Sequence, residues 1–216
     1  MSANQIGALF MIASMACFTL NDMFMKVTNG AIPLFQLLFL RGILTTLLII
    51  LLARWLNALH FNIARHDWRL IGLRSASEMV TAYFFITALF NMPLANVTAT
   101  LQALPLTVTL GGALLFREKV GWRRMSAILI GFIGMLLIVR PGAEGFNIYG
   151  IYALLAVLGV TIRDLVTRQL SVDVPSMTVT LAASVTVMGF SGVASLATPW
   201  VPISGMHALM VIGSSI

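Results

Sequence analysis

Residues 34–53 read LFQLLFLRGILTTLLIILLA, and this stretch decides the fold class. Its twenty residues include a single charged side chain, Arg41. About 20 mainly apolar residues are what an α-helix needs to cross a lipid bilayer. The apolar residues are continuous and do not alternate with polar ones, so the stretch predicts a membrane-spanning helix and disfavours a barrel strand.

Further apolar runs surround this stretch on both sides. They cover residues 6–25, 70–90, 94–116, 125–139, 148–166 and 177–197, and an eighth run begins after Pro202. Of the 216 residues, 59% are hydrophobic and 9% are charged, whereas a soluble domain carries roughly 25% charged residues. This composition, with its single cysteine, disfavours a soluble enzyme, a disordered chain and a disulfide scaffold. We predict an all-α polytopic membrane protein with about seven full spans and a partial eighth.

Basic residues are concentrated in two connections between the apolar runs. These residues are Arg54, Arg65 and Arg69 in one connection, and Arg117, Lys119, Arg123 and Arg124 in the other. The connections that alternate with these two carry few charges. By the positive-inside rule, the N-terminus and both basic loops are expected in the cytoplasm. This placement also explains the net charge of +6 without nucleic-acid binding, which we do not expect.

A charged pair and a proline recur along the chain at a fixed offset of 142 residues. The first set is Asp22, Lys26 and Pro33, and the second is Asp164, Arg168 and Pro175. The offset indicates a duplicated unit, residues 1–142 and 143–216, whose first copy holds five helices. Because five is odd, the second copy is expected to enter the membrane from the opposite side, as an inverted repeat. A full second copy would extend roughly 66 residues past Ile216, so we expect a truncated or partial chain.

Several short motifs point to a known family. They are Leu40-Arg41-Gly42, Ala88-Leu89, Pro105, Leu115-Phe116-Arg117-Glu118, Gly121-Trp122-Arg123-Arg124 and Gly131-Phe132-Ile133-Gly134. With these motifs, the stretch from Tyr83 to Gly142 resembles the EamA domain of the drug/metabolite transporter superfamily. The resemblance implies ten helices in the complete fold, a bacterial inner-membrane location, and metabolite export or uptake by proton coupling or exchange. Residues 18–22 and 36–42 also resemble the superfamily's vitamin and S-adenosylmethionine carriers.

Two ionisable residues stand well inside apolar runs. A charge there is costly, so such residues usually face a cavity or a partner. Arg41 is a candidate anchor for an anionic part of a substrate, because its guanidinium offers a fixed fork of donors. The alternative is a structural pair with a carboxylate on a neighbouring helix. Glu78 is a candidate proton-coupling site, and the alternative is an intrahelical ion pair with Arg74, one turn before it.

The duplicated charges, Asp22 with Lys26 and Asp164 with Arg168, are each spaced as i, i+4 pairs. Such pairs near opposite membrane faces fit gating ion pairs, or simple anchors of helix ends. Neutral candidates for a substrate-cavity wall are Asn21, Gln36, Tyr83 and Gln102. Gln102 precedes Pro105, which frees a backbone carbonyl that a cavity could use. Glu118 is expected to form a local ionic contact with its neighbours Arg117 and Lys119.

Motifs for other chemistries are missing from the sequence. It contains no H-E-x-x-H, no G-x-x-x-x-G-K, no G-x-G-x-x-G and no pair of cysteines. We therefore predict neither metal, cofactor nor ATP hydrolysis, and no enzyme activity. The sequence favours a secondary active transporter that moves a small amino-acid-, vitamin- or nucleoside-like metabolite across the bacterial inner membrane by alternating access. The alternative is a non-transporting membrane subunit or an inactive fragment of a transporter.

Overall fold

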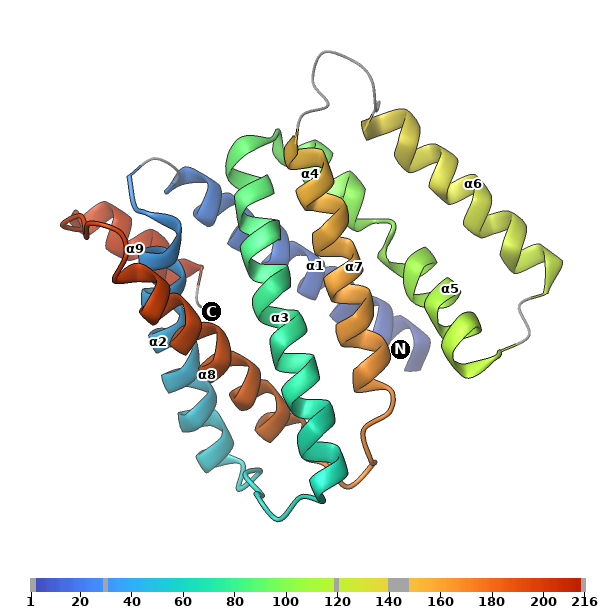
Figure 1. Cartoon of the computed structure of the whole chain (residues 1–216), viewed down its shortest axis with the longest axis horizontal. Coiled ribbons are helices and arrows are strands. Elements are labelled where there is room, and N and C mark those ends of the chain that lie inside the picture. Colours follow the sequence, from blue (N-terminus) through green and yellow to red (C-terminus); the bar gives the residue numbers. More distant parts are fainter. Residues whose placement is uncertain (1–2, 29–30, 119–120, 140–147, 215–216) are drawn as a thin grey trace.

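The computed structural model describes residues 3–28, 31–118, 121–139 and 148–214, and within these ranges every regular element is an α-helix. In chain order the helices are α1 (Ala3–Val27), α2 (Leu34–Trp55), α3 (Arg65–Asn91), α4 (Leu94–Leu101), α5 (Leu104–Phe116), α6 (Trp122–Val139), α7 (Ile148–Thr167), α8 (Ser176–Ser195) and α9 (Gly205–Gly213) (Figure 1). The all-α prediction is confirmed. The expected boundary between two repeats, at residue 142, lies outside the described residues.

Five helical stretches of the described chain are long and apolar enough to cross a membrane. They are Leu9–Val27, Leu34–Trp55, Leu94–Phe116, Ile148–Thr167 and Ser176–Ser195. Helix α3 is missing from this set because its first half carries several charged side chains, among them Arg65, Asp67 and Arg69. The multi-pass membrane character is therefore supported, whereas the expected count of seven spans is not confirmed.

The run expected as one helix over 94–116 forms two helices, α4 and α5, which meet at Gln102 and Ala103. Pro105 stands in the first turn of α5, and it has no N–H to donate to the carbonyl of Leu101. The proline thus breaks the helix completely. Helix α5 ends at Arg117, whose left-handed backbone (φ 55°) stops the helix.

Helices α2 and α8 pack against each other in antiparallel orientation. A Cβ atom on Gly42 would lie 2.8 Å from the Cβ and 3.1 Å from the Cα of Met188, so glycine allows the two backbones to approach closely. One turn further along α2, the hydroxyl of Thr46 lies 2.9 Å from that of Ser184, one turn earlier on α8. Along the contact, residue numbers increase on α2 while they decrease on α8, so the helices are antiparallel. Figure 1 shows the two helices side by side.

Helices α3 and α7 form a second antiparallel contact, at the middle of the molecule in Figure 1. Near one end of the contact, the rings of Phe84 and Tyr152 have centroids 5.1 Å apart. Near the other end, the carboxylate of Asp67 accepts hydrogen bonds from the backbone N–H and the hydroxyl of Ser171. The ring contact at one end and the hydrogen bonds between Asp67 and Ser171 at the other thus fix the register of α3 against α7.

The largest apolar core lies where α1, α2, α3 and α9 meet. Its fully buried members include Met25, Leu37, Leu89 and Val211. Outside this region, α1 contributes little to the interior, and its residues 9–20 are exposed. Most of the exposed side chains along α1 are large and apolar, which suits contact with lipid hydrocarbon.

Candidate functional site

Six ionisable side chains of α1, α2, α3 and α7 interact electrostatically between the helices of the bundle, and all six are partly exposed. They are Asp22, Arg41, Arg74, Glu78, Arg163 and Asp164, which we call the central charge cluster. Three of the six are acidic and three are basic, so the charges balance. Balanced charges on facing helices are the form in which ionisable residues are tolerated inside a membrane, commonly around a substrate or ion pathway.

A salt bridge between helices joins Glu78 on α3 to Arg163 on α7. The Arg163 Nη1 atom donates to both Glu78 carboxylate oxygens, at 3.4 and 3.3 Å, and its Nε donates to Asp164 at 2.9 Å. The side chains of Arg163 and Glu78 are 27% and 30% exposed. The salt bridge of Glu78 is therefore with Arg163, 85 residues away, and not with Arg74 on its own helix as the spacing suggested.

Arg41 extends from α2 toward α1 and α3. Its Nη1 lies 3.0 Å from the sulfur of Met25, and its charge interacts with the carboxylates of Asp22 and Glu78. The structure thus brings together three sequence-predicted site residues, Arg41, Asp22 and Glu78, from three different helices. This arrangement fits both sequence hypotheses for Arg41, a substrate anchor and a structural partner of carboxylates.

Lys26 does not form the expected ion pair with Asp22. Its ammonium group donates to the backbone carbonyl of Leu89, at 2.6 Å, and to that of Met92. These carbonyls belong to the C-terminal end of α3, where the helix dipole and unpaired carbonyls favour a cation. Lys26 therefore ties the end of α1 to the end of α3.

The i, i+4 pair expected between Asp164 and Arg168 is also replaced. Asp164 accepts from Arg163, while the Arg168 Nη1 atom lies 3.9 Å from the carboxylate of Glu118, beyond the end of α5. Glu118 thus contacts Arg168, which directly follows α7; the expected contact with Lys119 lies outside the described residues. Both partners of this long pair are about half exposed, so it contributes little to stability.

Two of the neutral candidates are bound to the backbone. The buried amide of Gln36 donates to the carbonyl of Val201 at 2.9 Å and accepts from its N–H at 3.0 Å. The amide of Asn21 donates to the carbonyl of Ser214 at 2.8 Å. Gln102 is exposed at the break between α4 and α5, away from these groups. None of these three amides is brought into the central charge cluster.

Tyr83 belongs to a group of aromatic rings. Its ring stacks on that of Phe35, with centroids 6.0 Å apart and planes inclined by 12°, and it meets Phe84 edge-on at 5.3 Å. Phe84 continues to Tyr152 on α7, and Phe35 continues to Phe190 on α8. We call these five residues the aromatic group. It begins five residues after Glu78 along α3, which places Tyr83 roughly 140° around the helix from Glu78.

Sequence reasoning did not select Arg163 or most of the aromatic group. A signal for Arg163 was present, because Asn21 occupies the corresponding place in the first copy of the repeat, which leaves Arg163 as an added charge in an apolar run. No comparable signal marks Phe35, Phe84 or Tyr152, since aromatic residues are common in membrane helices. Within the described ranges, no group of three or more His, Cys, Asp or Glu side chains could hold a metal ion.

Comparisons with known proteins find similarity to transporters. Over 81 residues, 38% of this chain, it is 36% identical to a riboflavin transporter of Vibrio cholerae. It is 24% identical over 166 residues to a pseudopaline exporter of Pseudomonas aeruginosa, covering 76% of this chain. Over 212 residues, 97% of this chain, it is 21% identical to an S-adenosylmethionine uptake transporter of Rickettsia prowazekii and covers 71% of that protein. No solved structure gives a significant match.

The matches differ in how much of each relative they cover. The chain spans 27% of the riboflavin transporter and 57% of the pseudopaline exporter, less than two thirds of either. The model of the EamA-like transporter family matches residues 5–140, which include α2 to α6 and all but the first two residues of α1, and with them Asp22, Arg41 and Glu78. With more than half of its length matched, and with balanced charges between apolar helices, the chain belongs to the EamA-like transporter family.

Proposed function

We propose that this chain forms the substrate pathway of a secondary active transporter, which moves a small organic metabolite across the bacterial inner membrane by alternating access. The observation that carries the proposal is the Glu78–Arg163 salt bridge, which crosses between α3 and α7 inside a balanced charge cluster. Charges placed between apolar helices are typical of substrate and ion pathways. The names of the relatives, all transporters in the three comparisons above, support the same function.

We infer that the two halves, residues 1–142 and 143–216, are inverted copies. The contacts between α2 and α8 support this inference. Adding 142 to Gly42 gives Ser184, and subtracting 142 from Met188 gives Thr46, so the Gly42–Met188 contact corresponds to the Thr46–Ser184 contact. Corresponding helices that pack antiparallel are what a two-fold axis in the membrane plane produces. With the N-terminus in the cytoplasm, the α2–α3 and α7–α8 connections lie on the cytoplasmic side.

The chemistry of the cluster suggests how ions and substrate would be coupled. Protonation of Glu78 removes the charge that holds Arg163 to α3, which leaves Arg163 with Asp164 alone. Release of this contact would let α3 and α7 move apart, and renewed ionisation would draw them together. Arg41, between Asp22 and Glu78, would bind an anionic group of the substrate in competition with these carboxylates. The cycle could run by proton coupling or by exchange.

The aromatic group suggests the class of substrate. A planar ring can stack on exposed aromatic faces while a charged group of the same molecule reaches Arg41 or Glu78. Riboflavin and S-adenosylmethionine, named for two relatives, both contain a planar nitrogen heterocycle. A vitamin- or nucleoside-like metabolite with a charged substituent therefore fits the site.

The proposal can be tested by reconstituting the 216-residue chain in liposomes and measuring uptake of radiolabelled riboflavin and S-adenosylmethionine. We expect Arg41→Ala to abolish transport, and Glu78→Gln to abolish accumulation driven by a pH gradient while leaving solute exchange. Arg54→Ala, at an exposed position near the end of the same helix as Arg41, is the matched control and should transport normally. A correctly inserted wild-type chain that moves neither solute, alone or in counterflow, would favour the alternative of a non-transporting subunit or inactive fragment.

A further inference from the structure

The hairpin formed by α5 and α6 is basic near the connection between its two helices. Arg117 ends α5, Arg123 and Arg124 stand in the first turn of α6, and all three residues are exposed. The left-handed backbone of Arg117 is one that glycine adopts at lower cost, yet an arginine occupies this position. The hairpin lies at the edge of the molecule in Figure 1, so these residues face outward.

The three arginines have no carboxylate partner in the described part of the chain. The acidic residue of the connection, Glu118, is paired with Arg168, and none of the salt bridges of the described residues involves the three arginines. The Cζ atom of Arg123 lies 5.6 Å from the centroid of the Trp122 ring, and this cation–π contact leaves the charge of Arg123 uncompensated. The hairpin surface is therefore complementary to an anion.

Arg124 extends along the hairpin, away from the connection. Its Nη2 atom donates to the hydroxyl of Thr109 at 3.3 Å, and this hydroxyl donates to the carbonyl of Pro105 at 2.7 Å. Leu106 packs against Gly131, which in an antiparallel hairpin places Thr109 about one turn further from the connection than Arg124. The bond to Thr109 uses one of the five N–H donors of a guanidinium, so this exposed side chain can donate to a ligand as well.

Large apolar side chains are exposed on both helices of the hairpin. Leu114 on α5 is 76% exposed and Ile130 on α6 is 70% exposed, as suits contact with lipid hydrocarbon. Trp122 is 77% exposed, and tryptophan prefers the level of the lipid headgroups. The three arginines thus stand where apolar side chains meet an interfacial residue, at the level where phosphate groups of lipids are found.

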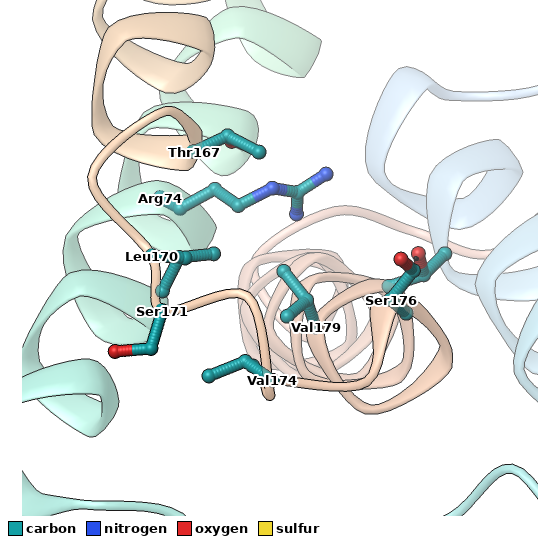
Figure 2. A pocket seen from close by; sticks show the side chains of 8 residues that line it. Arg74, Thr167, Leu170, Ser171, Val174, Ser176 and Val179 are labelled. Carbon is teal, nitrogen blue, oxygen red and sulfur yellow. Dashed lines mark hydrogen bonds between the residues drawn. The ribbon is translucent and has the colours of Figure 1, made fainter.

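Arg74 provides a contrast with these arginines. Figure 2 shows its side chain lying among Thr167, Leu170 and Val179, which belong to α7, to the connection after α7 and to α8. Its charge interacts with carboxylates of the central charge cluster. The arginines of the α5–α6 hairpin have no such carboxylates in the described chain, so their counter-charge has to come from a ligand.

We propose that the outer surface of the α5–α6 hairpin binds the headgroup of an anionic phospholipid. Arg124 donates to the lipid phosphate, Arg117 and Arg123 contribute positive charge, and Trp122 lies beside the headgroup. An anionic lipid suits this surface better than a zwitterionic one, because it brings no ammonium group that competes with the guanidinium groups for the phosphate. The proposal requires only that the chain lies in a membrane, so it does not depend on the transport proposal.

The test places the 216-residue chain in phosphatidylcholine nanodiscs and uses the fluorescence of Trp122 as a local probe. Of the four tryptophans, the other three are replaced by Trp55→Phe, Trp68→Phe and Trp200→Phe. Brominated phosphatidylglycerol, whose bromines quench tryptophan on contact, is compared with brominated phosphatidylcholine at the same low mole fraction. We expect phosphatidylglycerol to be enriched around Trp122 about tenfold.

Three variants of this probe protein connect the enrichment to Arg124. Arg124→Gln should lower it about fivefold, whereas Arg69→Gln, which removes the same charge at an exposed position of α3, should not. Thr109→Val keeps every charge but removes the partner that holds Arg124, so it should lower the enrichment about twofold; it decides the matter if Arg124→Gln does not fold. The proposal is overturned by equal quenching with both brominated lipids, by an equal loss in Arg69→Gln, or by full enrichment in both Arg124→Gln and Thr109→Val.

Discussion

The α2–α8 and α3–α7 contacts are both antiparallel and both join the first half of the chain to the second, yet their chemistry differs. Between α2 and α8, the backbone of Met188 packs closely against Gly42, and the hydroxyls of Thr46 and Ser184 form a hydrogen bond with each other. Between α3 and α7, Glu78 and Arg163 form an ion pair whose side chains are 30% exposed or less. Thr81, one turn away, has a buried hydroxyl with no partner in the described chain.

This difference indicates which contact can change during transport. The α2–α8 contact has one arrangement, because close backbone approach leaves little room for rotation or sliding. In the α3–α7 contact the groups have alternative partners, since Arg163 can bind either Glu78 or Asp164. We therefore interpret α2–α8 as the fixed support and α3–α7 as the contact that rearranges.

The largest expected effect comes from breaking the fixed contact. Gly42→Leu inserts a side chain where the backbone of Met188 lies 3.1 Å away, and overpacking of this kind costs about 3 kcal/mol. We expect a large loss in the free energy of unfolding, measured by denaturant titration in micelles. Gly189→Leu is the control, because nothing lies within 4 Å of its added Cβ. Equal stability of the two variants would contradict the close packing of α2 on α8.

A smaller loss is expected in the contact that rearranges. Arg163→Gln leaves the carboxylates of Glu78 and Asp164 without their shared cation, and for a partly buried site we expect about 2 kcal/mol of destabilisation. Glu78→Gln should cost less, because Arg163 keeps Asp164. Unfolding measurements on both variants would test this order. A larger loss for Glu78→Gln than for Arg163→Gln would contradict the role of Arg163 as the shared cation of both carboxylates.

Steric fit in the same contact can be tested by a rescue experiment. A Cβ on Gly159 would collide with the hydroxyl oxygen of Thr81, so Gly159→Ala should destabilise the protein by about 1 kcal/mol. Removing that oxygen with Thr81→Ala should restore most of the loss, since the hydroxyl has no partner within the described residues. Melting temperatures of the single and double variants provide the comparison. Additive losses would show that the two positions do not touch.

The smallest effect is expected for the hydroxyl pair between α2 and α8. A double-mutant cycle with Thr46→Val and Ser184→Ala should give a coupling of about 0.6 kcal/mol, the average for hydrogen bonds between membrane helices. The cycle requires unfolding free energies of four proteins under identical conditions. A coupling near zero would leave Gly42 and Met188 as the main determinants of this contact.

Much of the helical framework was predictable, because local sequence determines it. The run predicted over 34–53 corresponds to α2, and Pro33 and Pro175 immediately precede α2 and α8 at the predicted offset. Prolines fit these places because the first N–H groups of a helix need no internal partner. The break between α4 and α5 was not predicted, although Pro105 was singled out, since the strength of a proline effect depends on packing around it.

The partners of the charged residues were less predictable. Spacing of i, i+4 predicted Asp22 with Lys26 and Asp164 with Arg168, but contacts between helices replaced both pairs. A local pair on a helix surface contributes only a few tenths of a kcal/mol, so a helix end or a distant carboxylate readily displaces it. Arg41 and Glu78 were found because a charge inside an apolar run is visible without knowing the fold. Neutral amides such as Gln36 give no such signal, because backbone groups satisfy them equally well.

The attachment of Lys26 to the end of α3 has a mechanical consequence for α1. This helix is held at one end, by Lys26 and by the Asn21 amide, while residues 9–20 are exposed. The helix is therefore fixed near Lys26, and tilting of α1 would pivot about its contact with the last turn of α3. A small swing of α1 would then move Asp22 relative to Arg41.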